Sequence, residues 1–141
     1  MRPGMGDVLW TPAETRVAGA LVTRFRAAVN DRLGLGLESY EDLFRWSVVD
    51  RPGFWSAMWD FAQVVGEGPG EPVLAEGDRM PGARWFPAAR LNFAENLLRG
   101  DSSADALVFR GEEGDTRRLN FAELRAEVGR LAAALAADGV G

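Results

Sequence analysis

The sequence contains no cysteine, no histidine and no lysine, and each absence removes a kind of chemistry. Without cysteine there is no disulfide framework, no thiolate nucleophile and no Cys/His zinc site. Without histidine there is no imidazole base, and without lysine there is neither Schiff-base chemistry nor a P-loop lysine. A small enzyme made of this chain alone would have to use Ser, Thr, Tyr, Asp, Glu and Arg, and no constellation of these supports one.

The chain also lacks a block of positive charge and a long apolar run. Its net charge is −5, which argues against a nucleic-acid partner. No apolar stretch approaches the roughly 20 residues that span a bilayer, and the N-terminus lacks the apolar centre of a signal peptide. We therefore expect a soluble, cytoplasmic chain without a membrane partner. Hydrophobic residues make up 47% of the sequence, enough for a core.

The first strong helix signal follows a flexible tail, which we place at residues 1–9. Thr11 is predicted to be the N-cap, Pro12 the first helical residue and Glu14 the capping-box partner. Apolar residues then recur at helical spacing. We expect this helix to end near residues 30–31, before two glycines.

Two further helices are expected before residue 65. Ser39 and Asp42 should open a short one that runs through Trp46. The next begins after residues 50–53, and its apolar side chains are predicted to share one face: Phe54, Trp55, Met58, Phe61, Ala62 and Val65. Trp59 falls off that face and should meet a different neighbour. Aromatics so close together could stack on bases or a cofactor, but core packing is the commoner use of helical spacing.

The glycine-rich loop at residues 66–72 is predicted to be a hinge. It has neither the strand-to-helix context nor the following Lys-Ser/Thr of a phosphate-binding loop, and Glu67 and Glu71 would repel phosphate. A short extended segment is expected at residues 73–75. The loop therefore joins the helical part to this extended segment without offering a nucleotide site.

Residues 79–99, which we call the strap, begin irregularly and end in a helix. Pro81 and Pro87 argue against a regular element in the first half, where two large aromatic side chains need an apolar surface. In the second half Asn92 is the predicted cap of a short helix, with Gly100 as its stop. A ligand-facing alternative is that Arg84 or Arg90 meets a phosphate or carboxylate; their positions are otherwise compatible with a structural role.

The last part of the chain is predicted to be a β-hairpin followed by a helix. Residues 106–110 and 116–119 should pair across a turn at residues 111–115. Asn120 and Glu123 then form a capping box, and the helix should end near residues 138–139. The turn acids could be read as a paired-carboxylate or calcium site, but their spacing matches no ligand loop and solvated turn acids are commoner: Glu112, Glu113 and Asp115.

Residues 80–98, MPGARWFPAARLNFAENLL, closely resemble the N-terminal region of acetoacetyl-CoA synthetases, which belong to the adenylate-forming enzymes. The aromatic run at residues 40–61 resembles the same region. Residues 106–139 resemble the first hairpin and helix of adenylate-forming enzymes in general. The resemblance implies an α+β fragment: N-terminal helices, an irregular strap, then a β-hairpin and helix that begin the large α/β N-terminal domain. The resembling residues correspond to about the first fifth of a typical family member.

From this resemblance we expect four segments. They are a tail at 1–9, a helical aromatic-rich extension at 10–65, the loop, strap and short helix at 66–100, and the truncated start of the large domain at 101–141. The parent enzyme would join acetoacetate to CoA, using ATP and Mg²⁺ and releasing AMP and pyrophosphate. In the family these groups are bound downstream, so no residue here is expected to be catalytic, to bind a cofactor or to bind a metal.

The resemblance implies a structural role, in which the remainder of the same polypeptide is the partner. The expected anchors of the strap are Trp85, Phe86, Leu91, Asn92 and Asn96. If Trp85 is buried, its truncation to alanine should cost about 3–5 kcal/mol. Two alternatives stay open: a ligase for another short acid such as acetate or propionate, and a self-standing interaction module that uses the aromatic cluster as a binding face.

Overall fold

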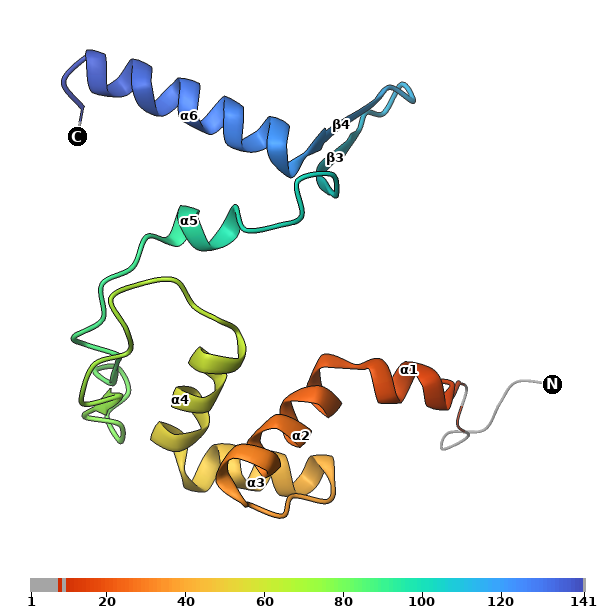
Figure 1. Cartoon of the computed structure of the whole chain (residues 1–141), viewed down its shortest axis with the longest axis vertical. Coiled ribbons are helices and arrows are strands. Elements are labelled where there is room, and N and C mark those ends of the chain that lie inside the picture. The colour runs from red at the N-terminus through yellow and green to blue at the C-terminus, as the bar shows by residue number, and fades with distance from the viewer. Residues whose placement is uncertain (1–7, 9, 141) are drawn as a thin grey trace. The chain divides into compact units, whose positions relative to one another are not determined.

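The computed structural model describes residue 8 and residues 10–140, so the predicted tail lies, apart from Val8, outside the described residues. Backbone contacts divide the chain into two units, Met1–Ala89 and Arg90–Gly141, and each is considered by itself (Figure 1). The boundary falls inside the strap. The described residues form helices and two small antiparallel sheets, as the sequence predicts in outline.

The first predicted helix is in fact two. Helix α1 spans Glu14–Gly19 and α2 spans Leu21–Leu33, with Ala20 extended between them (φ −66°, ψ 140°). The predicted capping box at Thr11 is wrong, because the N-cap is Ala13 and no side chain caps the helix. At the break, the Thr23 hydroxyl donates to the carbonyl of Val17 at 2.8 Å. The same carbonyl also accepts from the backbone N–H of Ala20 at 3.2 Å, so two donors meet it at the end of α1.

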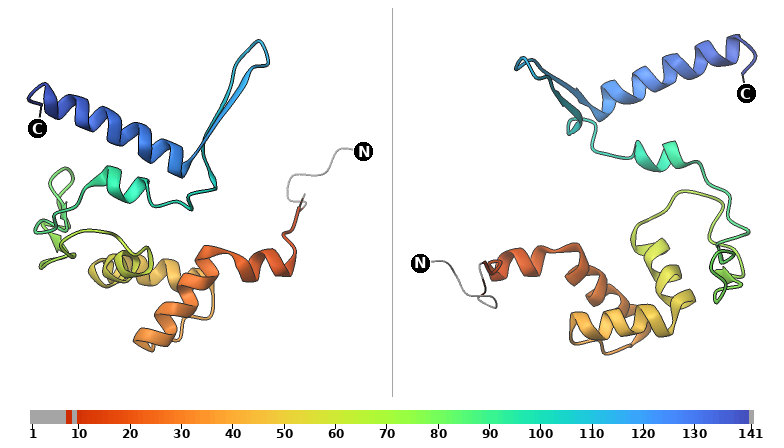
Figure 2. Two further views of the ribbon diagram at one scale, coloured as in Figure 1. Left: turned by 45° about the horizontal axis from the view of Figure 1, so that its top comes forward. Right: turned by 180° about the vertical axis from the view of Figure 1, so that it is seen from behind.

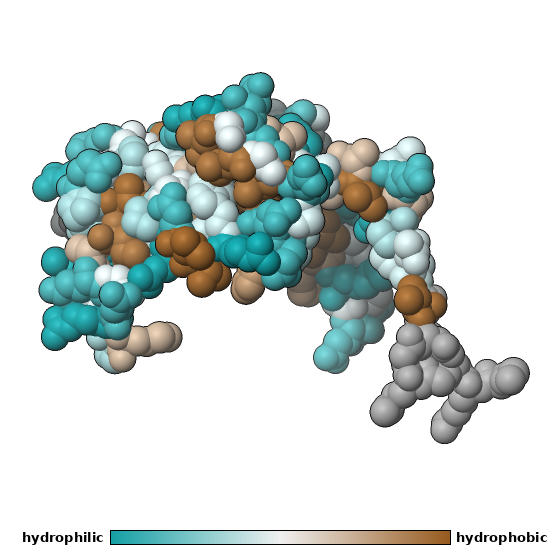
Figure 3. All heavy atoms as spheres, turned by 90° about the horizontal axis from the view of Figure 1, so that it is seen from below, coloured by the Kyte–Doolittle hydropathy of each residue, from teal (hydrophilic) through white to brown (hydrophobic). Residues whose placement is uncertain are grey.

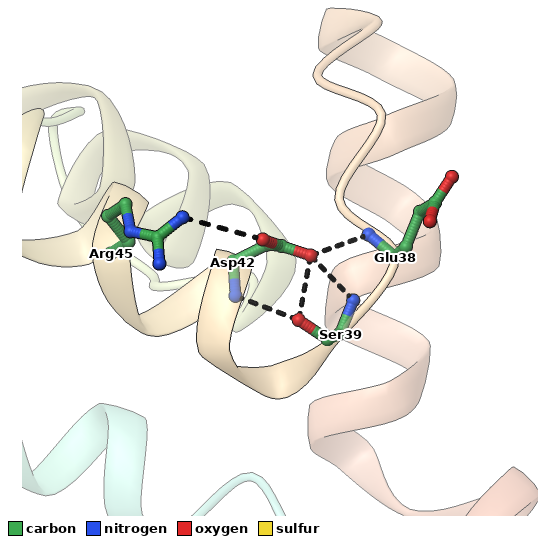
Figure 4. Close-up of polar contacts among 4 residues, drawn as sticks. All are labelled: Glu38, Ser39, Asp42 and Arg45. Carbon is green, nitrogen blue, oxygen red and sulfur yellow. Dashed lines mark hydrogen bonds and ion pairs between the residues drawn. The ribbon is translucent and has the colours of Figure 1, made fainter.

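Helix α3 begins where the sequence predicts, whereas α4 begins earlier than predicted, because residues 50–53 form its cap and first turn instead of preceding it. Helix α3 spans Tyr40–Val49, and Ser39 and Asp42 form a reciprocal capping box at its start (Figure 4). Helix α4 spans Arg51–Phe61, with the Asp50 carboxylate accepting from the backbone N–H of Gly53 at 3.0 Å. Because α4 ends at Phe61, Val65 lies outside the helical face on which it was predicted.

The core of the first unit lies where α4 packs against α2 and α3 (Figure 2). Phe25, Val29 and Leu43 are its buried residues, and Phe54 and Phe61 from α4 pack against them. The Phe25 ring meets Phe54 at 5.5 Å and Phe61 at 5.1 Å between centroids, both edge to face. Such pairs add about 0.5–1.5 kcal/mol each to the burial of area.

A small sheet follows the glycine-rich loop. Strand β1, Leu74–Ala75, pairs antiparallel with β2, Arg84–Trp85. The prediction that the first half of the strap holds no regular element is therefore wrong over two residues. Pro81 and Pro87 flank β2 without replacing a residue in it, so neither removes a donor from the ladder.

The second unit contains a short helix, a hairpin and a long helix. Helix α5 spans Phe93–Leu97, β3 spans Asp105–Arg110, β4 spans Thr116–Asn120 and α6 spans Phe121–Ala137. The hairpin and the Asn120–Glu123 capping box agree with the sequence prediction. None of the described residues 90–140 is buried, and Leu131 on the apolar stripe of α6 is 62% exposed.

Candidate functional site

The aromatic side chains of α4 point in two directions, and the strap packs against those on one side. Phe86 lies against Trp59 with ring centroids 4.9 Å apart, and Trp85 meets Trp55 at 5.6 Å. Trp59 is 9% exposed, whereas Trp85 is 42% exposed. The separate neighbour predicted for Trp59 is confirmed, but Trp55 also faces the strap and does not belong to the core-facing set.

The backbone of the strap is fixed to the segment before it. Leu74 is the register partner of Trp85, and the N–H of Phe86 donates to the carbonyl of Val73 at 2.8 Å. Val73 is buried. Phe86 has a φ of +46°, a conformation that costs an L-residue about 1–2 kcal/mol. Its backbone bond to Val73 and its contact with Trp59 compensate for that cost.

Arg51, at the first turn of α4, holds the loop that precedes the strap. Its guanidinium donates to the carbonyl of Gly77 at 2.7 Å and to the carboxylate of Asp78 at 2.8 Å. Asp78 is almost fully exposed, so this ion pair is screened by water, while the bond to the Gly77 carbonyl is partly buried. One side chain therefore connects the start of α4 to the loop at residues 76–79.

The remaining predicted anchors belong to the second unit. The Asn92 side chain accepts from the N–H of Glu95 at 3.2 Å and caps α5, and Asn96 donates to the carbonyl of Asn92 at 3.0 Å. Leu91 is 47% exposed. The structure thus places Trp85 and Phe86 against α4. Asn92 and Asn96 have a local role at the start of α5.

A second arginine organises the start of the second unit. Arg125 on α6 donates to the carbonyls of Leu98 at 2.7 Å and Gly100 at 3.1 Å, and to the Ser102 hydroxyl at 2.6 Å. Gly100 also lies against the ring of Phe121: a Cβ built on it would fall 2.1 Å from a ring carbon. Glycine is required there by close approach of the backbone to the ring.

Neither arginine was predicted from the sequence, because an arginine on an amphipathic helix carries no local sign of a distant carbonyl partner. Gly100 was assigned only as a helix stop. The prediction that α4 begins after residues 50–53 left Arg51 outside the helix, and nothing in the sequence indicated the loop that Arg51 holds.

Arg84 and Arg90, the two arginines with a predicted ligand-facing alternative, are both exposed to solvent. Among residues 8 and 10–140, no three acidic side chains converge in a group that could hold a metal ion. These residues therefore offer no cluster of carboxylates for Mg²⁺, and we derive no reaction step through Mg²⁺ or ATP.

Among the described residues, two carboxylates have lowered pKa values, and both shifts come from local caps and turns. Bonds from the hydroxyl and the N–H of Ser39 hold the pKa of Asp42 below its ordinary value of 3.8 (Figure 4). Bonds from the N–H and the hydroxyl of Ser103 likewise lower the pKa of Asp101. Both groups are stabilised in the ionised form, and neither has the raised pKa of a general acid.

No helix in the described part of the chain has the length and apolar character needed to cross a membrane.

Comparison with known proteins identifies the region that this fold represents. Residues 40–97 match the family model described as the acetyl-coenzyme A synthetase N-terminus. The chain is 47% identical over 94% of its length to an acetoacetyl-coenzyme A synthetase of Rhizobium meliloti (strain 1021), and 36% identical over 99% to an acetoacetyl-CoA synthetase of Macaca fascicularis. An acetoacetyl-CoA synthetase from Streptomyces lividans has a matching structure, with a TM-score of 0.78 and 40% identity over 92% of the chain.

In sequence and in fold, the chain is similar to the N-terminal region of acyl-CoA synthetases. The relatives with which it shares the identities given above are acetoacetyl-CoA synthetases. The chain spans about a fifth of their length, 20% of the Rhizobium protein and 20% of the solved Streptomyces chain.

Proposed function

We propose that the chain is the N-terminal structural portion of an AMP-forming acetoacetate–CoA ligase. The whole enzyme would convert acetoacetate, ATP and CoA into acetoacetyl-CoA, AMP and pyrophosphate in the cytoplasm. The observation that carries the proposal is 47% identity over 94% of the chain with an acetoacetyl-coenzyme A synthetase. The 141 residues alone are expected to be inactive, because they contain no lysine or histidine and their described part offers no cluster of carboxylates for Mg²⁺.

In this proposal the chain has a structural role and supports the large domain of the enzyme. Residues 10–65 form a helical extension, residues 66–100 the loop, strap and short helix, and residues 101–141 the beginning of the large α/β domain. Trp85 and Phe86 anchor the strap on α4, and Leu91, Asn92 and Asn96 shape the turn of chain that leads into the hairpin. The rings at 4.9 and 5.6 Å and the bond from Arg51 to Gly77 support the first part of this assignment.

ATP, Mg²⁺ and CoA are cofactors and substrates of the proposed enzyme, and we assign their binding to polypeptide other than these residues. The loop at residues 66–72 carries Glu67 and Glu71, whose charge repels phosphate. The partners of this chain are therefore the rest of the same polypeptide and, through it, small-molecule substrates.

A ligase for acetate or propionate is the second candidate, favoured by the description of the family model that matches residues 40–97. Acid-dependent exchange of labelled pyrophosphate into ATP by the full-length protein separates the two. We expect the highest kcat/KM with acetoacetate, and a higher kcat/KM with acetate or propionate would overturn the choice. Failure to exchange with any of the three acids would overturn the proposed function, provided that the protein is folded.

A further inference from the structure

A groove on the first unit has apolar walls and faces outward. It lies among α2, α3 and α4 and encloses about 510 Å³. Leu21 from α2 and Phe44 from α3 stand at its edges and are 67% and 51% exposed. Its lining contains no charged residue. In Figure 3 hydrophobic residues, drawn in brown, reach the surface of the molecule between hydrophilic ones.

The base of the groove belongs to the best-packed part of the chain. Phe25 and Leu43 line it and are only 2% and 5% exposed, and Phe61 meets Phe25 edge to face. A wall held by packed aromatic rings keeps its shape without a ligand, because core side chains sit in close-packed, defined rotamers. The groove is therefore formed in advance of whatever fills it.

The chemistry of the lining restricts the occupant. Tyr40 and Ser47 are its polar residues, and the Ser47 hydroxyl already donates to the carbonyl of Phe44 at 2.7 Å. A phosphate or carboxylate would lose its hydration and find no cation in return. An apolar segment gains about 25 cal/mol for each Å² of apolar surface removed from water.

We propose that this groove is filled by an apolar polypeptide segment from outside residues 1–141, within the same polypeptide. The inference rests on the proposed function, and the length of the relatives supports it: the chain spans 20% of the Rhizobium synthetase and 20% of the solved Streptomyces chain. Most of such a protein is thus available to cover the groove at the effective concentration of an intramolecular contact.

Thiol accessibility tests the proposal, because residues 1–141 contain no cysteine. Phe44→Cys places a thiol in the groove, and Val49→Cys places one on the same helix, at a residue that does not line the groove. The full-length protein and the 141-residue chain are labelled with a maleimide, and the modified peptide is quantified by mass spectrometry. Tyr40→Cys, at the exposed rim, repeats the measurement with less loss of packing.

We expect the groove thiols to react at least about tenfold more slowly in the full-length protein than in the 141-residue chain. Val49→Cys should show a smaller difference. Equal reactivity of the groove thiols in both proteins overturns the proposal. So does protection that disappears on dilution, which indicates a second copy, or protection that requires an added short-chain acyl compound.

Pyrophosphate exchange by the unsubstituted protein keeps the two claims separate. An active acetoacetate ligase with freely reactive groove thiols contradicts the docking inference alone. A protected groove in a protein that activates a different acid contradicts the proposed substrate alone.

Discussion

The ring of Phe86 lies against the indole of Trp59, with centroids 4.9 Å apart, although the backbone of Phe86 has a φ of +46°. A bulky residue in this region is unusual, so the contact must offset the cost of the conformation. Because Trp59 is buried and also belongs to α4, the pair ties the strap to the helical part of the first unit.

Trp59→Ala should be much more damaging than Trp85→Ala. Removing the buried indole should lower the free energy of unfolding by about 3–5 kcal/mol. Trp85 is 42% exposed and packs on Trp55 at one edge, so its loss should cost about 1–2 kcal/mol in the 141-residue chain, less than expected for a buried residue. Urea unfolding followed by circular dichroism measures both, and equal costs would contradict the geometry.

Arg51→Ala should loosen the strap more than Asp78→Ala. The first change removes the partly buried bond to the Gly77 carbonyl and the ion pair, at a cost of about 1–2 kcal/mol. The second removes only a screened ion pair, worth less than about 1 kcal/mol. Hydrogen exchange at the Phe86 amide, which donates to Val73, reports the difference. Faster exchange in Asp78→Ala than in Arg51→Ala would refute this role for the arginine.

Two glycine substitutions in the second unit should have opposite signs. Gly100→Ala places a methyl group against the Phe121 ring and should destabilise the unit by about 1–3 kcal/mol. Gly129 lies inside α6, and a Cβ there would meet nothing within 4 Å. Gly129→Ala should therefore stabilise the helix by about 0.5–1 kcal/mol. Thermal unfolding of the full-length protein compares them, and a stabilising Gly100→Ala would show that the ring can move aside freely.

The cap of α3 predicts an acid dependence of stability. Asp42 has a lowered pKa in the folded state, so the unfolded chain takes up its proton more readily. The stabilisation is fully present above the ordinary pKa of 3.8 and is lost as the pH falls through the lowered folded value. Asp42→Asn should flatten this part of the stability–pH curve, and Ser39→Ala should cost about 1 kcal/mol at neutral pH.

Urea unfolding at a series of pH values, from neutral to below 3.8, measures the effect. Glu41→Gln removes a negative charge from an exposed neighbour on the same helix and is the matched control. An Asp42→Asn curve parallel to that of the unsubstituted protein would rule out this contribution.

The sequence predicted those features whose signals are local. The caps at Ser39, Asn92 and Asn120 each bind a backbone N–H three residues away, so a short stretch of sequence contains the whole interaction. The hairpin at residues 105–120 could also be predicted, because its two strands are adjacent in the sequence and are joined by a short turn.

The errors arose where contacts made at a distance, or a weakly marked break, decided the structure. The first helix breaks at Ala20, directly after Gly19, and one glycine inside a helical pattern does not by itself predict a break. The Thr23–Val17 bond at the break leaves no recognisable spacing. The pairing of β1 with β2 spans a loop of irregular chain, so periodicity could not reveal it. In the candidate site, Trp85 and Phe86 were identified from their size, but their partners on α4 required the fold.

Exposure in the second unit leads to the most direct test of the account. No described residue in 90–140 is buried, while Phe25, Val29 and Leu43 form a core in the first unit. An isolated two-stranded hairpin is marginally stable in water. If further polypeptide completes the second unit, its hairpin amides should be protected only in the presence of that polypeptide.

Hydrogen exchange of the 141-residue chain, compared peptide by peptide with the full-length protein, measures this. We predict that peptides from residues 105–120 exchange rapidly in the short chain and slowly in the full-length protein, while α2 and α4 are protected in both. Equal protection of the hairpin in the two proteins would contradict the claim that this chain is a structural portion of a larger enzyme.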